Sequence, residues 1–215
     1  MTVTAKICGI NDPVAMRTAI DAGASHVGLV FYPPSPRAVT PDEAAPLADL
    51  ADGKAMRTGL FVNPDDDLID TTLAHVSLDL LQLHGGESPD RVRDLKGRTG
   101  RAVMKVIRVG EAGDIDRARD YLEVADWLMF DALPPKSLKN ALPGGNAVAF
   151  DWALLSGREW PLPWMLAGGL TAENVAEAVR LSGAPVVDTS SGVEDEPGRK
   201  NPDKIRAFLG AVSAL

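Results

Sequence analysis

A repeated strand–helix pattern is the feature of this sequence that most constrains its fold. Short apolar, β-rich runs recur along the chain, and amphipathic helical patterns lie between them. The eight runs end near Cys8, Phe31, Val62, His84, Val106, Phe130, Ala167 and Asp188. Eight strands that each lead into a helix predict an α/β fold, a single (β/α)8 TIM barrel whose strands all run parallel.

An open, doubly wound sheet is the alternative fold, because it also alternates strands with helices. No Gly-x-Gly-x-x-Gly pattern follows the first run, and the count of eight favours a closed barrel. The length of 215 residues suits one barrel, and no linker or low-complexity segment divides it. We therefore expect one domain over residues 1–215.

The segments between the runs carry clear helix-start signals. We predict helices over residues 13–22, 41–51, 64–74, 89–95, 115–124, 172–181 and 202–212. Four of them begin with a capping side chain and a proline, at Asp12-Pro13, Thr40-Pro41, Asn63-Pro64 and Ser88-Pro89. The longest gap, between the sixth and seventh runs, is rich in proline, glycine and lysine, which is typical of a functional loop after a barrel strand.

The charge and cysteine content restrict the partners and the compartment. A net charge of −8 disfavours nucleic acid and anionic membranes, and no apolar run reaches membrane-spanning length. The single cysteine excludes an intrachain disulfide, and the first residues show no secretion signal, so we expect a cytoplasmic protein. With 5% aromatic residues and an acidic surface, we expect a monomer, with a homodimer as the alternative.

Two strand ends rich in small residues predict a phosphate site. In a (β/α)8 barrel the functional residues sit at the C-terminal ends of the strands. The seventh run ends at Gly168-Gly169, and the eighth passes Asp188 into Ser190-Ser191-Gly192. Glycine lets backbone amides approach a phosphate closely, and the positive end of a following helix favours an anion. For one such segment alone, an ordinary strand-to-helix turn is the alternative.

One thiol and one carboxyl at strand ends suit proton transfer. Cys8 ends the first run, where nearby cations would lower the pKa of its thiol and let it act as a base. Asp131 follows the sixth run, in an apolar setting that suits a general acid. The alternatives are a buried structural thiol and a helix cap. From strands one and six, the two side chains can face each other across the barrel mouth.

Arg37 and His84 are the remaining candidates for this mouth. Arg37 follows a stiff, proline-rich segment that can hold its guanidinium ready to bind a carboxylate, with an ordinary surface arginine as the alternative. His84, at the end of the fourth run, either lines the pocket or bonds a backbone carbonyl. Three histidines without a Cys/His cluster argue against zinc, so we expect no metal, and His26 and His75 are interpreted as structural.

Lys6 is expected to point into the barrel, one layer below Cys8, because strand side chains alternate between faces. A lysine in that place needs an acidic partner. The sequence leaves three open: Asp131, Asp151 and Asp188. Lys6 either has a structural role or changes the pKa of the general acid.

These segments together resemble the phosphoribosylanthranilate isomerase family. The matching blocks run in the family's order from residue 6 to about residue 200, nearly the whole chain. They include Lys6-Ile-Cys-Gly-Ile10, Ser35-Pro-Arg37, Gln82-Leu-His-Gly85, Phe130-Asp131, Pro143-Gly-Gly-Asn146, Leu166-Ala-Gly-Gly-Leu170 and Ser190-Ser-Gly-Val-Glu194. Two departures are Ala147, where the family often has glycine, and Asn201, where aspartate commonly follows the lysine.

The resemblance implies an Amadori rearrangement of a small phosphorylated substrate, N-(5-phosphoribosyl)anthranilate. It implies Asp131 as general acid, Cys8 as general base and Arg37 as the ligand of the anthranilate carboxylate. The phosphate would bind backbone amides near Gly168, Gly169, Ser191 and Gly192. No organic cofactor is implied, because the nitrogen of the substrate serves as the electron sink.

Three other functions remain open at this point. One is a different phosphate-binding barrel of tryptophan or histidine synthesis, which we would expect to use carboxylate pairs or a lysine. Another is a non-catalytic sugar-phosphate barrel, which would keep the glycine loops and lose the acid or the base. The third is additional activity on the related aminoaldose of histidine synthesis.

Overall fold

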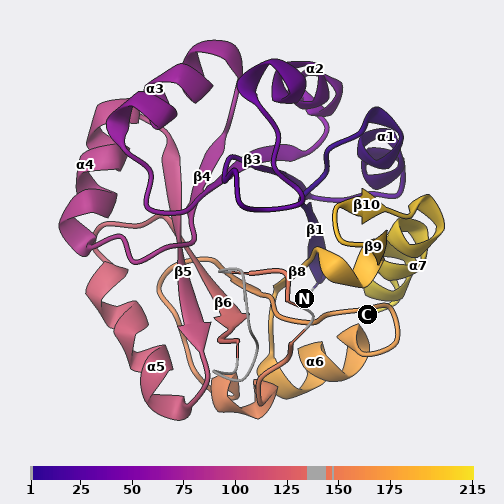
Figure 1. Ribbon diagram of the computed structural model, residues 1–215. Coiled ribbons are helices and arrows are strands. Elements are labelled where there is room, and N and C mark those ends of the chain that lie inside the picture. The colour runs from indigo at the N-terminus through magenta and orange to yellow at the C-terminus, as the bar shows by residue number, and fades with distance from the viewer. Residues whose placement is uncertain (1, 135–143, 147) are drawn as a thin grey trace.

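The chain forms a closed barrel of eight parallel strands. The computed structural model describes residues 2–134, 144–146 and 148–215, so Pro143 and Ala147 lie outside the described residues. The strands surround the centre in sequence order (Figure 1). They are β1 (Thr4–Cys8), β2 (His26–Val30), β3 (Met56–Phe61), β4 (Leu80–Leu83), β5 (Ala102–Val109), β6 (Trp127–Ala132), β7 (Trp164–Leu166) and β8 (Val186–Thr189).

The barrel closes because β1 pairs with strands on both of its sides. Its register places Lys6 opposite His26 on β2 and opposite Asp188 on β8. All eight pairings around the ring are parallel. The predicted (β/α)8 barrel is therefore confirmed and the open sheet is wrong.

Helices form an outer ring around the strands (Figure 1). The α-helices are α1 (Pro13–Asp21), α2 (Pro41–Ala51), α3 (Asp66–His75), α4 (Pro89–Thr99), α5 (Ala112–Asp116), α6 (Val175–Ser182) and α7 (Pro202–Ser213). Short 3-10 helices are η1 (Arg117–Tyr121), η2 (Trp152–Leu155) and η3 (Ser191–Val193). A small antiparallel hairpin, β9 (Glu194–Glu196) with β10 (Arg199–Lys200), follows β8.

Most of the predicted helix caps are present. Asp12, Thr40 and Ser88 each accept a backbone N–H in the first turn of their helices, which stabilises those ends. Asn201 caps α7 in the same way, so asparagine replaces aspartate there without loss of the cap. The expected start of the third helix is wrong: Asp65 caps α3, two residues after Asn63.

Two gaps differ from the predicted pattern. The helix expected over 115–124 begins earlier, at Ala112, and continues as the 3-10 turn η1, while β5 extends to Val109. Between β6 and β7 the described residues contain only the 3-10 turn η2. Gly157, with φ of 68°, and the prolines at 161 and 163 prevent an α-helix from continuing toward β7.

The apolar core has two parts. The larger part lies between the strands and the helices. The smaller part follows the alternation that also brings Lys6 and Cys8 inward, and it fills the barrel below the pocket with Leu80, Met104, Val106, Met129, Met165, Ala167 and Val186. None of the described helices is long and apolar enough to cross a membrane.

Candidate active site

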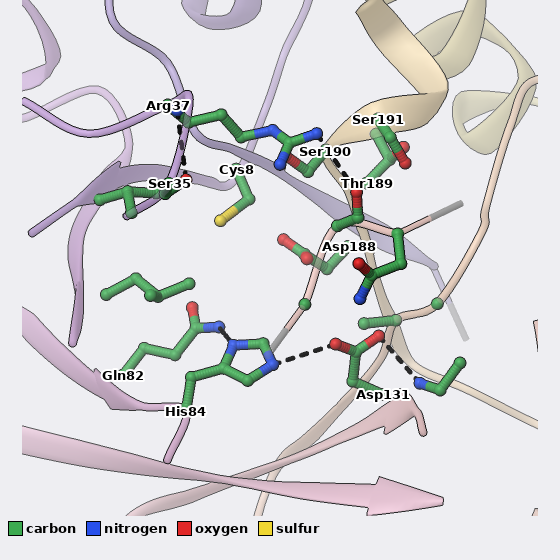
Figure 2. Close-up of a pocket in the computed structure, with 18 of the residues that line it drawn as sticks. Cys8, Ser35, Arg37, Gln82, His84, Asp131, Asp188, Thr189, Ser190 and Ser191 are labelled. Atoms are coloured by element: carbon green, nitrogen blue, oxygen red, sulfur yellow. Dashed lines mark hydrogen bonds and ion pairs between the residues drawn. The ribbon is translucent and has the colours of Figure 1, made fainter. Parts of the chain in front are cut away.

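A pocket opens at the C-terminal ends of the strands, where the barrel rule places function (Figure 2). Its lining comes from the ends of most of the strands and from the loop before Asn146. Nine of the ten predicted site residues line it: Cys8, Arg37, His84, Asp131, Gly168, Gly169, Asp188, Ser190 and Ser191. Gly192 lies just behind the lining.

Cys8 is the buried last residue of β1, and its sulfur points into the pocket (Figure 2). Burial raises the pKa of the Cys8 thiol, while the Lys6 ammonium acts in the opposite direction. The two groups share a small space beside Gly28, where an added Cβ would lie 2.9 Å from Cys8 Sγ and 3.1 Å from Lys6 Nζ. A cation therefore lies next to the thiol.

Lys6 is fully buried and binds Asp188. Its Nζ lies 2.8 Å from Asp188 Oδ1, which settles the partner that the sequence left open. Burial lowers the pKa of Lys6, but the Asp188 carboxylate outweighs that effect and holds the pKa above its ordinary value. The two side chains form an ion pair, so together they add no net charge beneath the thiol.

Asp131 is held at the opposite side of the pocket by a chain of hydrogen bonds (Figure 2). Gln82 Nε2 lies 3.2 Å from His84 Nδ1, within hydrogen-bonding distance. His84 Nε2 in turn forms a hydrogen bond with Asp131 Oδ2 across 3.0 Å. The Ala132 backbone N–H donates to Oδ1 across 2.9 Å. Both oxygens are held, which fixes the direction of the carboxyl group.

Gly144 and Gly145, in the long loop after β6, pack directly on these groups. A Cβ at Gly144 would lie 2.8 Å from His84 Nε2 and 2.9 Å from Asp131 Oδ2. A Cβ at Gly145, where φ is 73°, would lie 2.6 Å from Arg37 Nη1. The two glycines therefore let the backbone cover the polar side chains closely.

Arg37 is held by a carboxylate rather than by the prolines alone. Its Nε and Nη2 donate to Glu194 Oε1 and Oε2, each across 2.7 Å. Its stem lies against Gly9, where an added Cβ would be 2.6 Å from the Arg37 Cδ. The guanidinium is thus a buried, fixed group, and the surface alternative is wrong.

The two glycine-containing loops after β7 and β8 lie side by side. Gly168 and Gly169 have φ of 95° and 64°, a conformation that favours glycine. Leu170 C=O accepts from Thr189 Oγ1 across 2.7 Å, and a Cβ at Gly192 would come within 2.0 Å of that carbonyl oxygen. Gly192 therefore allows the two backbones to meet.

Sequence reasoning missed three of the charged or polar groups in this region. Gln82 contacts and orients His84. Its position two residues before a histidine at a strand end, and so on the same face of the strand, could have indicated this contact. Glu194 and Lys200 lie on the hairpin beyond β8, which the strand-end rule does not cover. His26 and His75 lie away from the pocket, as expected, bonded to Ser25 Oγ and to a backbone carbonyl.

Comparison with known proteins points to one family. The N-(5'-phosphoribosyl)anthranilate (PRA) isomerase family model matches residues 5–211. The N-(5'-phosphoribosyl)anthranilate isomerase of Paramagnetospirillum magneticum is 61% identical over 212 residues, 99% of this chain and 98% of that protein. The crystal structure of phosphoribosyl anthranilate isomerase from Thermotoga maritima has a TM-score of 0.87 and 34% identity, covering 99% and 100% of the two chains. Another such isomerase, bound to reduced 1-(o-carboxyphenylamino)-1-deoxyribulose 5-phosphate, has a TM-score of 0.83 and 32% identity, with the same coverage.

Proposed function

The chain belongs to the N-(5'-phosphoribosyl)anthranilate isomerase family, and from this premise we propose how its pocket performs the reaction. The protein is an isomerase of tryptophan biosynthesis. It converts N-(5-phosphoribosyl)anthranilate into 1-(2-carboxyphenylamino)-1-deoxyribulose 5-phosphate, an Amadori rearrangement.

The two anionic ends of the substrate bind at separate places. The anthranilate carboxylate binds the fixed guanidinium of Arg37. The phosphate binds backbone amides of the adjacent loops at Gly168-Gly169 and Ser190-Ser191-Gly192, whose close packing supports a shared anion site. His84 and Asp188 bind the ribose, a role that their place in the lining of the same pocket supports.

Two proton-transferring groups act on the ribose between these anchors. Asp131 protonates the furanose ring oxygen, the C1′–O bond breaks, and an iminium ion forms. The Cys8 thiolate then removes the C2′ proton to give an enolamine. Protonation at C1′ and loss of the hydroxyl proton at C2′ yield the ketone and restore both groups. The route calls for no metal or organic cofactor, because the substrate nitrogen accepts the electron pair.

A single observation carries this proposal: a thiol and a carboxyl face one pocket from β1 and β6, on opposite sides of the space (Figure 2). The Lys6 ammonium lies beside the thiol, and His84 fixes the carboxyl. A ligand held at both ends would therefore present its C1′ and C2′ atoms between an acid and a base.

Decay of substrate fluorescence in a coupled assay tests the assignment of the acid. Asp131→Asn keeps the shape of the side chain and removes the transferable proton, so we expect kcat to fall by about 10²- to 10⁴-fold with an unchanged circular dichroism spectrum. Full activity of Asp131→Asn would refute the assignment. The aminoaldose of histidine synthesis is assayed in parallel, and we expect turnover of the anthranilate substrate only.

The same premise gives three proposals about the protein as a whole. We propose that residues 1–215 fold as one domain, that the protein is a monomer and that it works in the cytoplasm. Its only cysteine is free, which suits a reducing compartment. Three large hydrophobic side chains are exposed among the described residues: Val14 on α1, Leu133 just after β6 and Leu215 just after α7. Three single side chains in different segments support the monomer. Light scattering during gel filtration measures the oligomeric state.

A further inference from the structure

The hairpin after β8 brings two charged side chains under the pocket. Glu194 begins β9 and Lys200 ends β10, and both side chains are buried, with the Lys200 side chain at 0% exposure. Neither is one of the proton-transferring groups. Buried charges cost free energy unless they are paired, so this arrangement needs an explanation.

The Lys200 ammonium contacts both Glu194 and Ser190 of the loop after β8. Its Nζ lies 2.7 Å from Glu194 Oε1, 2.9 Å from the Ser190 carbonyl oxygen and 3.2 Å from Ser190 Oγ. Glu194 in turn holds Arg37 through both of its carboxylate oxygens. Glu194 therefore lies between two cations, Lys200 and Arg37. Lys200 also holds Ser190 of the loop after β8.

The charges of this cluster do not cancel. Arg37 and Glu194 together carry no net charge, so a guanidinium held in this way has little remaining attraction for a second carboxylate. Burial lowers the pKa of Lys200, and the Glu194 carboxylate opposes that effect. As an ammonium, Lys200 makes the cluster of three positive by one unit. The nearby Lys6–Asp188 pair is neutral, so it does not change this balance.

The ionised state of the central carboxylate is supported by its neighbours. Burial raises the pKa of Glu194, but hydrogen bonds from Arg37 and the charge of Lys200 outweigh it, so the pKa lies below its ordinary value. Glu194 accepts hydrogen bonds from Nε and Nη2 of the guanidinium, and Nη2 also donates to the Gly145 carbonyl oxygen. Arg37 and Gly145 both line the pocket, so the guanidinium borders the space that a ligand enters.

We propose that Lys200 determines the specificity of the pocket for a ligand with a carboxylate at its aromatic end, because its ammonium restores the positive charge that Glu194 removes from Arg37. The inference rests on the proposed function, in which Arg37 binds the anthranilate carboxylate. Lys200 does not touch the ligand; it acts through Glu194 and Arg37 as a positioning residue. An incoming carboxylate makes the cluster neutral, which is the state that a buried site favours.

Two ligands and three proteins test this charge argument by calorimetry. The ligands are reduced 1-(2-carboxyphenylamino)-1-deoxyribulose 5-phosphate and the same compound without its carboxyl group. The proteins are the wild type, Lys200→Met and the control Arg199→Met. Arg199 is the neighbouring residue on β10, its side chain is 65% exposed, and it contacts Glu196 and Asp195 rather than the pocket.

The ratio of the two dissociation constants is the measurement. We expect the wild type and Arg199→Met to prefer the carboxylated ligand by about 10- to 100-fold, the range for hydrogen bonds to charged groups. In Lys200→Met this preference should fall by about tenfold, because loss of the Lys200 contacts with Ser190 affects both ligands through their shared phosphate and cancels in the ratio. Kinetically, KM for the substrate should rise more than kcat falls.

A double variant separates charge from shape. Glu194→Gln/Lys200→Met removes one charge of each sign and leaves Arg37 with its full positive charge. We expect it to regain part of the lost preference for the carboxylated ligand. Lys200→Met itself leaves the buried Arg37–Glu194 pair intact and creates no unpaired charge, so we expect it to fold.

Each outcome has a defined meaning. If Lys200→Met keeps the full preference, or weakens both ligands equally, Lys200 has only a structural role and the inference is wrong. The same holds if the double variant regains nothing. If the wild type itself shows no preference, the proposed role of Arg37 fails first, and the inference fails with it.

Discussion

At the scale of single residues, the environment of Cys8 is the most informative part of the site. A thiol buried at a strand end is a poor base, because burial opposes the charged thiolate. The Lys6 ammonium lies beside it and favours the thiolate. Asp188 keeps that lysine charged, so three residues determine how basic the thiol is.

The reactivity of Cys8 with iodoacetamide measures this balance directly. It is the only cysteine in the chain, so alkylation reports on no other thiol. We expect the rate to increase with pH toward a midpoint above the usual range of a cysteine, because burial raises the pKa of Cys8. In Lys6→Met/Asp188→Asn the midpoint should move to still higher pH, because the charge and hydrogen bond of Lys6 lower the pKa of Cys8 by more than Asp188 raises it. An unchanged midpoint would show that the pair as a whole does not favour the thiolate.

The residues found from the sequence share one property, and those missed lack it. Cys8, Asp131 and His84 lie at or next to the ends of strands, where strand periodicity and barrel topology together fix their position. Glu194 and Lys200 reach the site from a hairpin whose path depends on tertiary packing. No local sequence pattern encodes that path. The motif that contains Glu194 therefore does not predict its contact with Arg37.

At the scale of elements, another buried ion pair joins neighbouring parts of the barrel rim. Lys105 on β5 lies 2.5 Å from Glu87 Oε2, and the Asn63 N–H donates to Glu87 Oε1 across 2.8 Å. Glu87 also accepts from the Gly85 N–H. The loops after β3 and β4 are thereby tied to β5. Asn63, with φ of 47°, adopts a left-handed conformation to make this contact.

Removing one member of this pair should be costly. In Glu87→Gln the Lys105 ammonium is left buried without a counter-charge, and we expect the free energy of unfolding to fall by about 3–5 kcal/mol. Urea titration measures it. The double variant Glu87→Gln/Lys105→Met should recover part of the loss. If both variants were equally unstable, the loss would come from the backbone contacts of Glu87 instead.

The same pair predicts a pH dependence of stability. Burial raises the pKa of Glu87, but Lys105 outweighs it and the pKa is lower than usual. A lowered folded-state pKa contributes stability that is complete above the ordinary carboxyl pKa and is lost as the pH falls through the folded value. The free energy of unfolding should therefore fall less steeply with decreasing pH in Glu87→Gln than in the wild type.

At the scale of the whole molecule, the tryptophans test whether the barrel is one cooperative unit. All four, at 127, 152, 160 and 164, lie between the start of β6 and the start of β7. Their fluorescence reports on that sector, whereas far-ultraviolet circular dichroism reports on every helix in the ring. The two signals therefore follow different parts of the same structure.

We expect the two signals to give the same midpoint and slope in urea, because each of the strands β1 to β8 is paired on both sides within one closed barrel. An earlier change in fluorescence would show that the β6–β7 sector unfolds separately and would contradict a single domain over residues 1–215. Trp127→Phe serves as a control, because the fluorescence of the other three then reports on residues 152–164 alone.

The pairing of β1 with β8 has a consequence for folding during synthesis on the ribosome. Lys6 and Asp188 are 182 positions apart, so the first strand leaves the ribosome long before its partner exists. Until β8 arrives, β1 has an open edge, and the ammonium beside Cys8 lacks its counter-ion. The proposed base is therefore synthesised long before the carboxylate that completes its surroundings, and it reaches its final environment only after β8 has formed.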